Sequence, residues 1–211
     1  QALHRNTTAS NNTAVGMQSL EANTTASNNT AVGYRAGTTT TTGADNVAVG
    51  SDALFANTTG ASNVAIGHDA LGENTTASNN TAVGMSALLA NTTGTRNVAV
   101  GGISLDANTT GNDNTAIGYS SLSSNVTGTR NTALGTYALD INTGDDNTAL
   151  GRAAMDVNTS GGANTAVGSG ALGANTTASN NTAVGYSALL ANTTGGQNVA
   201  VGDNALNANT T

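Results

Sequence analysis

The sequence predicts an all-β protein: a parallel β-solenoid (β-roll) of about twelve 17-residue coils, packed side by side with other copies. Three observations predict this fold class. One short motif recurs at a nearly constant spacing along the chain, its residues have β-strand composition, and no Asn-Gly or Asp-Gly hairpin turn occurs. Repeats built from two helices need about 33 residues, so this period is too short for them.

The repeat is defined by the glycine that ends each "A-[VIL]-G". These glycines are Gly16, Gly33, Gly50, Gly67, Gly84, Gly101, Gly118, Gly135, Gly151, Gly168, Gly185 and Gly202. Every step between them is 17 residues, except the 16-residue repeat at 136–151, where "DINTGDDN" lacks one Thr of the usual N-T-T. We therefore expect residues 1–211 to form a single continuous repeat array without separate domains.

The segment before each glycine, "NTAVG" or "NVAVG", is the expected strand. Thr and Val are both β-branched and favour strands, whereas the abundant Gly, Asn and Thr disfavour helix. Without hairpin turns the strands of successive coils should run parallel, about 4.8 Å apart, so that twelve coils would extend about 58 Å.

The expected core follows from alternation along the strand, which places Thr13 and Val15 on one face and Ala14 on the other. We expect the Val/Ile/Leu position and the recurring Leu to fill a narrow core between two short sheets: Val15, Leu20, Val32, Leu54, Val83, Leu88, Leu122, Val184 and Leu189. The invariant Ala would then face outward, and a repeated small residue there predicts lateral packing against other copies. The alternative is a monomer in which Ala merely suits a tight turn.

The asparagine before each strand never varies, and stacked coils place like residues on like. We expect these side chains to form a hydrogen-bonded ladder and to tolerate left-handed backbone at a corner. The ladder comprises Asn12, Asn29, Asn46, Asn63, Asn80, Asn97, Asn114, Asn131, Asn147, Asn164, Asn181 and Asn198. The repeated glycine is expected at the tightest corner, where a Cβ would not fit.

Composition excludes several function classes. The net charge is −7, with five Arg and no Lys, which argues against nucleic acid as a partner. No apolar run approaches the roughly 18 residues of a membrane helix, so no membrane insertion is expected within these residues. The two histidines, His4 and His68, lie at variable positions, and the scattered Asp residues lack the period of calcium-binding solenoids. We predict no enzyme, with no catalytic, cofactor-binding or metal-binding residues and no cofactor.

The N-T-T triplets have the form of glycosylation sequons. The candidate sites are Asn6, Asn23, Asn57, Asn74, Asn91, Asn108, Asn175, Asn192 and Asn209. The alternative is a turn in which Asn occupies a corner and Thr stacks. Tyr34, Tyr119 and Tyr186 share the position after the repeated glycine and are candidate contacts for a receptor.

The motifs "NNTAVG", "SNVAIG" and "NTAIGYSSL" resemble the head repeats of trimeric autotransporter adhesins (YadA-like, haemagglutinin-type) and the shaft repeats of phage-type tail fibres. The resemblance covers the entire chain. It implies a left-handed parallel β-roll, three chains side by side, an extracellular or cell-surface location and a role in attachment. The present repeat departs from the adhesin heads in having a longer coil.

The expected function is a structural extracellular fibre or adhesin segment that gives length, stiffness and surface attachment. Expected partners are further copies, as a trimer or an end-to-end filament, and a host or surface receptor. The end-to-end option follows from residues 1–8, which match the phase of residues 204–211. The alternatives are a phage-like tail-fibre shaft and an ice-binding β-solenoid using Thr/Asn ranks on a charge-poor surface.

Overall fold

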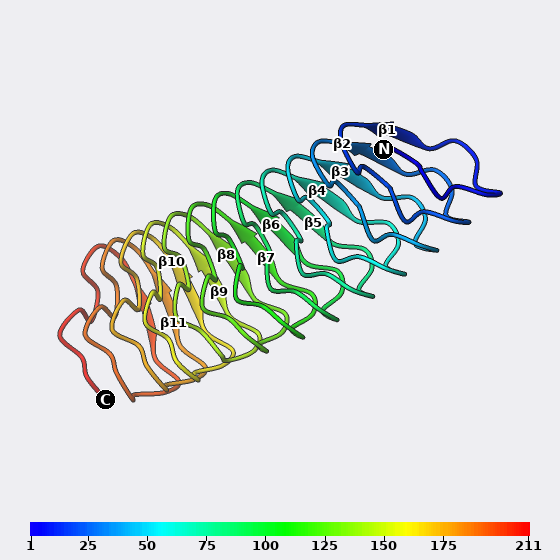
Figure 1. Cartoon of the computed structure of the whole chain (residues 1–211). Coiled ribbons are helices and arrows are strands. Elements are labelled where there is room, and N and C mark those ends of the chain that lie inside the picture. Colours follow the sequence, from blue (N-terminus) through cyan, green and yellow to red (C-terminus); the bar gives the residue numbers. More distant parts are fainter. The chain divides into compact units, whose positions relative to one another are not determined.

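The computed structural model describes residues 1–211 and contains twelve parallel strands and no helix. The chain divides into two compact units, Gln1–Thr110 and Gly111–Thr211, and each is described by itself. Within each unit the coils follow one another in sequence order (Figure 1). The predicted all-β parallel solenoid is therefore confirmed.

Each coil contributes one strand of three residues. The strands of the first unit are β1 (Thr13–Val15), β2 (Thr30–Val32), β3 (Val47–Val49), β4 (Val64–Ile66), β5 (Thr81–Val83) and β6 (Val98–Val100). Those of the second unit are β7 (Thr115–Ile117), β8 (Thr132–Leu134), β9 (Thr148–Leu150), β10 (Thr165–Val167), β11 (Thr182–Val184) and β12 (Val199–Val201).

Neighbouring strands within each unit pair at identical repeat positions. Ala14 lies opposite Ala31 between β1 and β2, and the 16-residue repeat keeps this register, with Ala133 opposite Ala149. The backbone bonds continue beyond the strands. In the turn after the strand, for example, the Leu20 amide donates to the Ala36 carbonyl at 3.0 Å. Adjacent coils are thus joined along the strand and along the turns.

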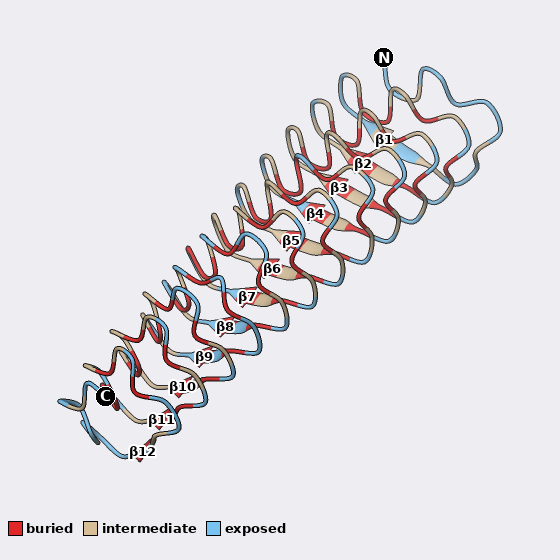
Figure 2. Cartoon of the chain, turned by 90° about the horizontal axis from the view of Figure 1, so that it is seen from below, coloured by how far each residue is buried: buried red, intermediate tan, exposed pale blue.

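The interior of each coil is lined by alanine and leucine. The strand alanines Ala31, Ala82 and Ala149 are completely buried. Figure 2 shows the middle of several strands more buried than their ends. The leucines predicted for the core are 0–2% exposed: Leu20, Leu54, Leu88, Leu122 and Leu189.

The four valines predicted for the core lie outside it, so that part of the prediction is wrong. Val15 is 58% exposed, and Val32, Val83 and Val184 are only half-buried. The interior is too narrow for them, because the leucine position faces the strand alanine directly. A Cβ built on Gly37, which replaces that leucine once, would lie 3.1 Å from Leu20 Cδ2 and 3.9 Å from Ala31 Cβ.

The second predicted sheet is absent, since the described chain contains one strand per coil. The Ala-Leu segment is a turn in which the leucine has left-handed backbone, as at Leu20 (φ 47°) and Leu88 (φ 53°). This conformation costs a non-glycine residue about 1–2 kcal/mol. Complete burial of a leucine side chain contributes about 1.5–3 kcal/mol, which is enough to offset the cost of the left-handed backbone.

The two corners that flank the strand differ. At the repeated glycine, φ is 139° for Gly84, and an added Cβ would lie 2.6 Å from the carbonyl carbon of Gly101 in the next coil. Glycine is required there, as predicted. At the other corner the left-handed residue is the one before the invariant asparagine, as at Asn28 (φ 63°) and Ser62 (φ 58°), and not the invariant asparagine itself.

Candidate functional site

The outer face of the sheet carries an unbroken series of branched aliphatic side chains within each unit. The third residue of every strand points outward, opposite to the buried alanine. We name these residues the outer aliphatic column: Val15, Val32, Val49, Ile66, Val83 and Val100 in the first unit, and Ile117, Leu134, Leu150, Val167, Val184 and Val201 in the second. Their exposure includes 39% for Ile66, 42% for Leu134 and 69% for Val201.

A second column runs beside the first on the same face, formed by the first residue of each strand. It is always Thr or Val, as at Thr30, Val47 and Val64, all half-buried. The two columns make an outer face without a charged side chain at either strand position. The sequence analysis missed this face because it assigned these residues to the interior.

Larger side chains stand at the position after the repeated glycine. Tyr34, Tyr119 and Tyr186 are 43%, 50% and 61% exposed, as a contact with a receptor would require. Tyr119 packs edge to face on Tyr137, with ring centroids 5.8 Å apart. The Arg35 guanidinium lies 4.9 Å from the Tyr34 ring centroid. Two of the three predicted tyrosines, Tyr34 and Tyr119, thus make a side-chain contact within the chain.

The invariant asparagines form a ladder, but most of its partners are backbone groups; a direct side-chain bond joins Asn164 Nδ2 to Asn147 Oδ1 at 3.2 Å. The backbone N–H of Asn29 donates to Asn12 Oδ1 at 2.8 Å, and the side-chain Nδ2 of Asn29 donates to the Gly43 carbonyl at 3.0 Å. The same pair of bonds recurs at Asn46 and Asn181. Each side chain therefore joins its own coil to the next through main-chain groups.

A true side-chain ladder exists at the asparagine of the N-T-T triplets. Asn91 Nδ2 donates to Asn74 Oδ1 at 3.0 Å and to the Gly94 carbonyl at 2.9 Å, so both of its hydrogens are used. In turn, Asn91 Oδ1 accepts from Asn108 Nδ2 at 2.9 Å. This position occurs thirteen times in the chain and is Asn in twelve of them, and this regularity indicates a structural role.

This ladder overturns the glycosylation prediction for the interior coils. Seven of the candidate asparagines are completely buried: Asn23, Asn57, Asn74, Asn91, Asn108, Asn175 and Asn192. A glycan on such an Nδ2 would replace a core hydrogen bond and could not reach solvent. Asn6 and Asn209, in the first and last coils, are less buried.

The threonines after this asparagine divide into two kinds. The first is half-buried and its hydroxyl donates to the next coil, as from Thr24 Oγ1 to the Thr41 carbonyl at 3.2 Å and from Thr58 Oγ1 to the Thr75 carbonyl at 3.0 Å. The second is exposed, as at Thr25 and Thr59. The turn therefore presents one exposed rank of threonine, while the other rank is engaged in coil-to-coil bonds.

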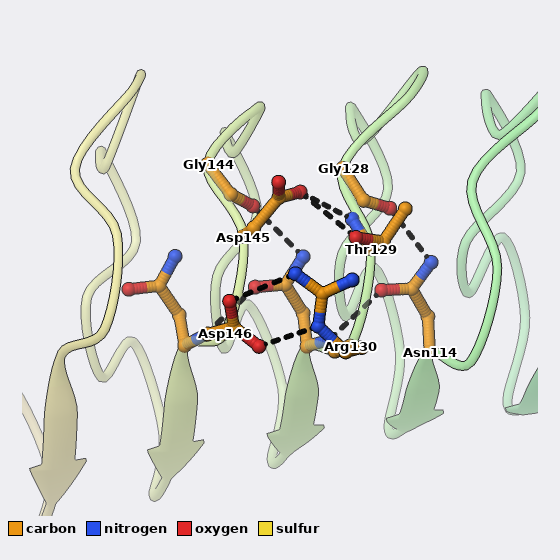
Figure 3. A network of polar contacts seen from close by, with 9 residues as sticks. Asn114, Gly128, Thr129, Arg130, Gly144, Asp145 and Asp146 are labelled. Atoms are coloured by element: carbon orange, nitrogen blue, oxygen red, sulfur yellow. Dashed lines mark hydrogen bonds and ion pairs between the residues drawn. The ribbon is translucent and has the colours of Figure 1, made fainter.

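The shortened repeat carries an exposed ion network in the second unit (Figure 3). Arg130 donates from Nε and a terminal nitrogen to the two carboxylate oxygens of Asp146, at 2.6 and 2.9 Å. This bond holds the pKa of Asp146 below its ordinary value and raises the pKa of Arg130. Asp145 accepts from the Thr129 amide at 2.7 Å. These charges fasten the shortened turn to the preceding coil.

Two surface hollows occur where glycine follows the core leucine, one in each unit. The first, of about 630 Å³, is next to Gly72, and the second, of about 460 Å³, is next to Gly173. Leu89 and Leu190 of the following coils lean over these glycines, each 3.0 Å from where a Cβ would stand. In the second hollow, burial raises the pKa of Asp156 above its ordinary value.

The two histidines lie in different surroundings. His4 Nδ1 is 2.9 Å from Gln1 Oε1, whereas His68 Nδ1 is 3.0 Å from Asp69 Oδ2. Asp52, of the preceding coil, joins this pair, and one ligand atom from each of the three residues lies within 4.8 Å of the others. The sequence analysis predicted no metal site, yet positions 52 and 69 are one period apart and therefore stack.

Comparison of the chain with protein-family models, with curated proteins and with solved structures gives no match. The resemblance to adhesin and tail-fibre repeats therefore rests on the motifs alone. No helix of the structure has the length and apolar character needed to cross a membrane.

Proposed function

We propose that the chain is a structural, non-enzymatic segment of an extracellular fibre or adhesin, and that further copies pack laterally on the outer face of its sheet. The observation that carries this proposal is the outer aliphatic column. Scattered exposed aliphatic side chains are normal on soluble proteins, but a contiguous apolar patch marks an interaction site. In each unit six such residues follow one another from coil to coil.

The free energy available from apolar burial favours an interface that uses both columns. An exposed or half-buried Val or Ile that becomes fully buried contributes about 1 kcal/mol, so the six residues of one unit's outer aliphatic column supply roughly 6 kcal/mol. Association of two proteins costs an estimated 4–15 kcal/mol in lost motional freedom. The outer aliphatic column of one unit reaches only the lower part of that range. The neighbouring Thr/Val column, or the second unit, must contribute to a stable assembly.

The coil-to-coil bonding supports a role as a stiff spacer. Interior coils are held to one another by backbone bonds along the strand and turns, by the invariant asparagines and, except where Thr40 replaces the asparagine, by the buried N-T-T asparagines. Bending between such coils would stretch several hydrogen bonds at once. The exposed Tyr34, Tyr119 and Tyr186 are the side chains we assign to receptor contact. A phage-like tail-fibre shaft would use the same features.

Ice binding has less support from these observations. A regular array of threonine hydroxyls exposed to water would favour it. The hydroxyl of the first threonine of each pair instead donates to a backbone carbonyl of the next coil, as at Thr24, Thr58 and Thr92. On the flat outer face of the sheet, threonine shares its column with valine, as at Thr30 and Val47. An apolar face of this kind suits a protein neighbour better.

Lateral association is tested by placing one charge in the outer aliphatic column. We expect Ile66→Glu to lower the oligomeric state of the chain, because a carboxylate would be desolvated at the interface without a partner. The readout is native mass spectrometry and sedimentation equilibrium at micromolar concentration. Asn79→Asp is the matched control, since Asn79 is exposed and other coils carry Asp45 and Asp146 at its position. A wild-type chain that is monomeric at this concentration would contradict the proposal.

A further inference from the structure

The strongest unassigned feature of the first unit is the cluster of Asp52, His68 and Asp69. Asp52 and Asp69 occupy the same repeat position, two residues after the repeated glycine, and both have left-handed backbone (φ 58° and 56°). The Asp69 amide donates to the Ser51 carbonyl at 3.0 Å, which fixes the register between the two coils. The solenoid therefore stacks two carboxylates one coil apart.

The charges of this cluster are only partly compensated. Arg35, one coil before Asp52 in the same stack, places its Nε 2.7 Å from Asp52 Oδ1. Asp69 has the His68 imidazole as its neighbour, and Glu73 lines the same surface hollow as Arg35, Asp52 and Asp69. The residues lining this hollow include one Arg and three carboxylates. This excess of negative charge attracts a further cation.

We propose that Asp52, His68 and Asp69 bind a divalent transition-metal ion, with Zn²⁺ as the best-fitting common ion. Two carboxylate oxygens and one imidazole nitrogen are a donor set that zinc accepts, with water completing its coordination. Zinc–ligand bonds of about 2.0–2.2 Å place two ligands of one ion roughly 3.3–4.2 Å apart. The three ligand atoms already lie within 4.8 Å of one another. Asp52 Oδ1 is paired with Arg35 and Asp52 Oδ2 accepts from the Ser51 hydroxyl at 3.1 Å, so the ion would share this carboxylate with those two groups.

Access and selectivity follow from the surroundings. The His68 side chain is 59% exposed and that of Asp69 34%, so an ion can enter with its water ligands, while the 14% exposed Asp52 anchors the inner side. Calcium and magnesium prefer sites made only of oxygen ligands and gain little from an imidazole. The site should therefore discriminate between Zn²⁺ and Ca²⁺. A bound ion would cross-link two successive coils of the first unit.

Isothermal titration of the full chain with ZnCl₂ tests this proposal. We expect one zinc site per chain, an affinity at least about tenfold lower in His68→Ala and in Asp69→Asn, and no comparable heat with CaCl₂. His4→Ala is the matched control, because it removes the only other histidine from a place beside Gln1. Circular dichroism checks that each variant keeps the fold.

Two results would overturn the assignment. The first is a wild-type chain that takes up no zinc. The second is an equal affinity in His68→Ala and His4→Ala, which would place the metal elsewhere. Neither result bears on lateral association, because the outer aliphatic column contains none of the three ligands.

Discussion

Gly168→Ala is expected to destabilise the second unit by more than about 3 kcal/mol, or to prevent its folding. Gly168 has φ 130°, a backbone conformation that side chains rarely adopt, and its added Cβ would lie 2.6 Å from the carbonyl carbon of Gly185. The obstacle is main chain of the next coil, which cannot rotate away as a side chain could. Urea unfolding followed by circular dichroism measures the loss.

Gly170→Ala, two residues away, is the matched control. Gly170 also has positive φ, at 67°, but the nearest atom to its added Cβ is Ser187 Oγ at an ordinary 3.5 Å. The preceding coil already carries Ala153 at this position, with φ 51°. We therefore expect a change of at most about 1 kcal/mol. Equal losses for the two variants would show that coil-to-coil contact at the repeated glycine is not the cause.

Leu88→Asp is the second large expected effect, a loss of about 4 kcal/mol or more in the first unit. Leu88 is completely buried and its backbone is left-handed. The substitution removes the burial that holds this turn and places a carboxylate among apolar groups. The measurement is urea unfolding at neutral pH, where an exposed Asp is ionised.

Met85→Asp controls for the added charge in the same coil. Met85 is 58% exposed, so its replacement should change the unfolding free energy by less than about 0.5 kcal/mol. A similar stability for the two Asp variants would mean that the leucine stack is not the core of the coil.

The period was sufficient to predict the parallel coil and its register. Once like residues stack on like, the need for glycine at Gly84 and the burial of Leu88 follow from repetition and elementary sterics. The cluster at Asp52, His68 and Asp69 was also accessible in principle, because two of its members differ by one period. The exact hydrogen-bond partners of the asparagines could not be predicted from the sequence, because either side-chain or backbone groups can complete a ladder.

The sequence could not decide which face of the strand lies inside. Alternation separates Ala82 from Thr81 and Val83 but does not say which side is buried. The width of the coil decides it, and that width depends on the left-handed turn at Leu88 and on the buried Asn91, which follow the strand by several residues in the sequence. A core of large side chains was the ordinary expectation, and it led to the wrong face.

The orientation of the strand is therefore the central claim, and thiol labelling tests it most directly. The chain has no cysteine, so Ala82→Cys and Val83→Cys each introduce a single thiol at adjacent positions. At concentrations below association, we expect the thiol at position 83 to react readily and that at position 82 to react at least about a hundredfold more slowly, with equal rates after unfolding. Rapid labelling at position 82 together with protection at position 83 would contradict the account.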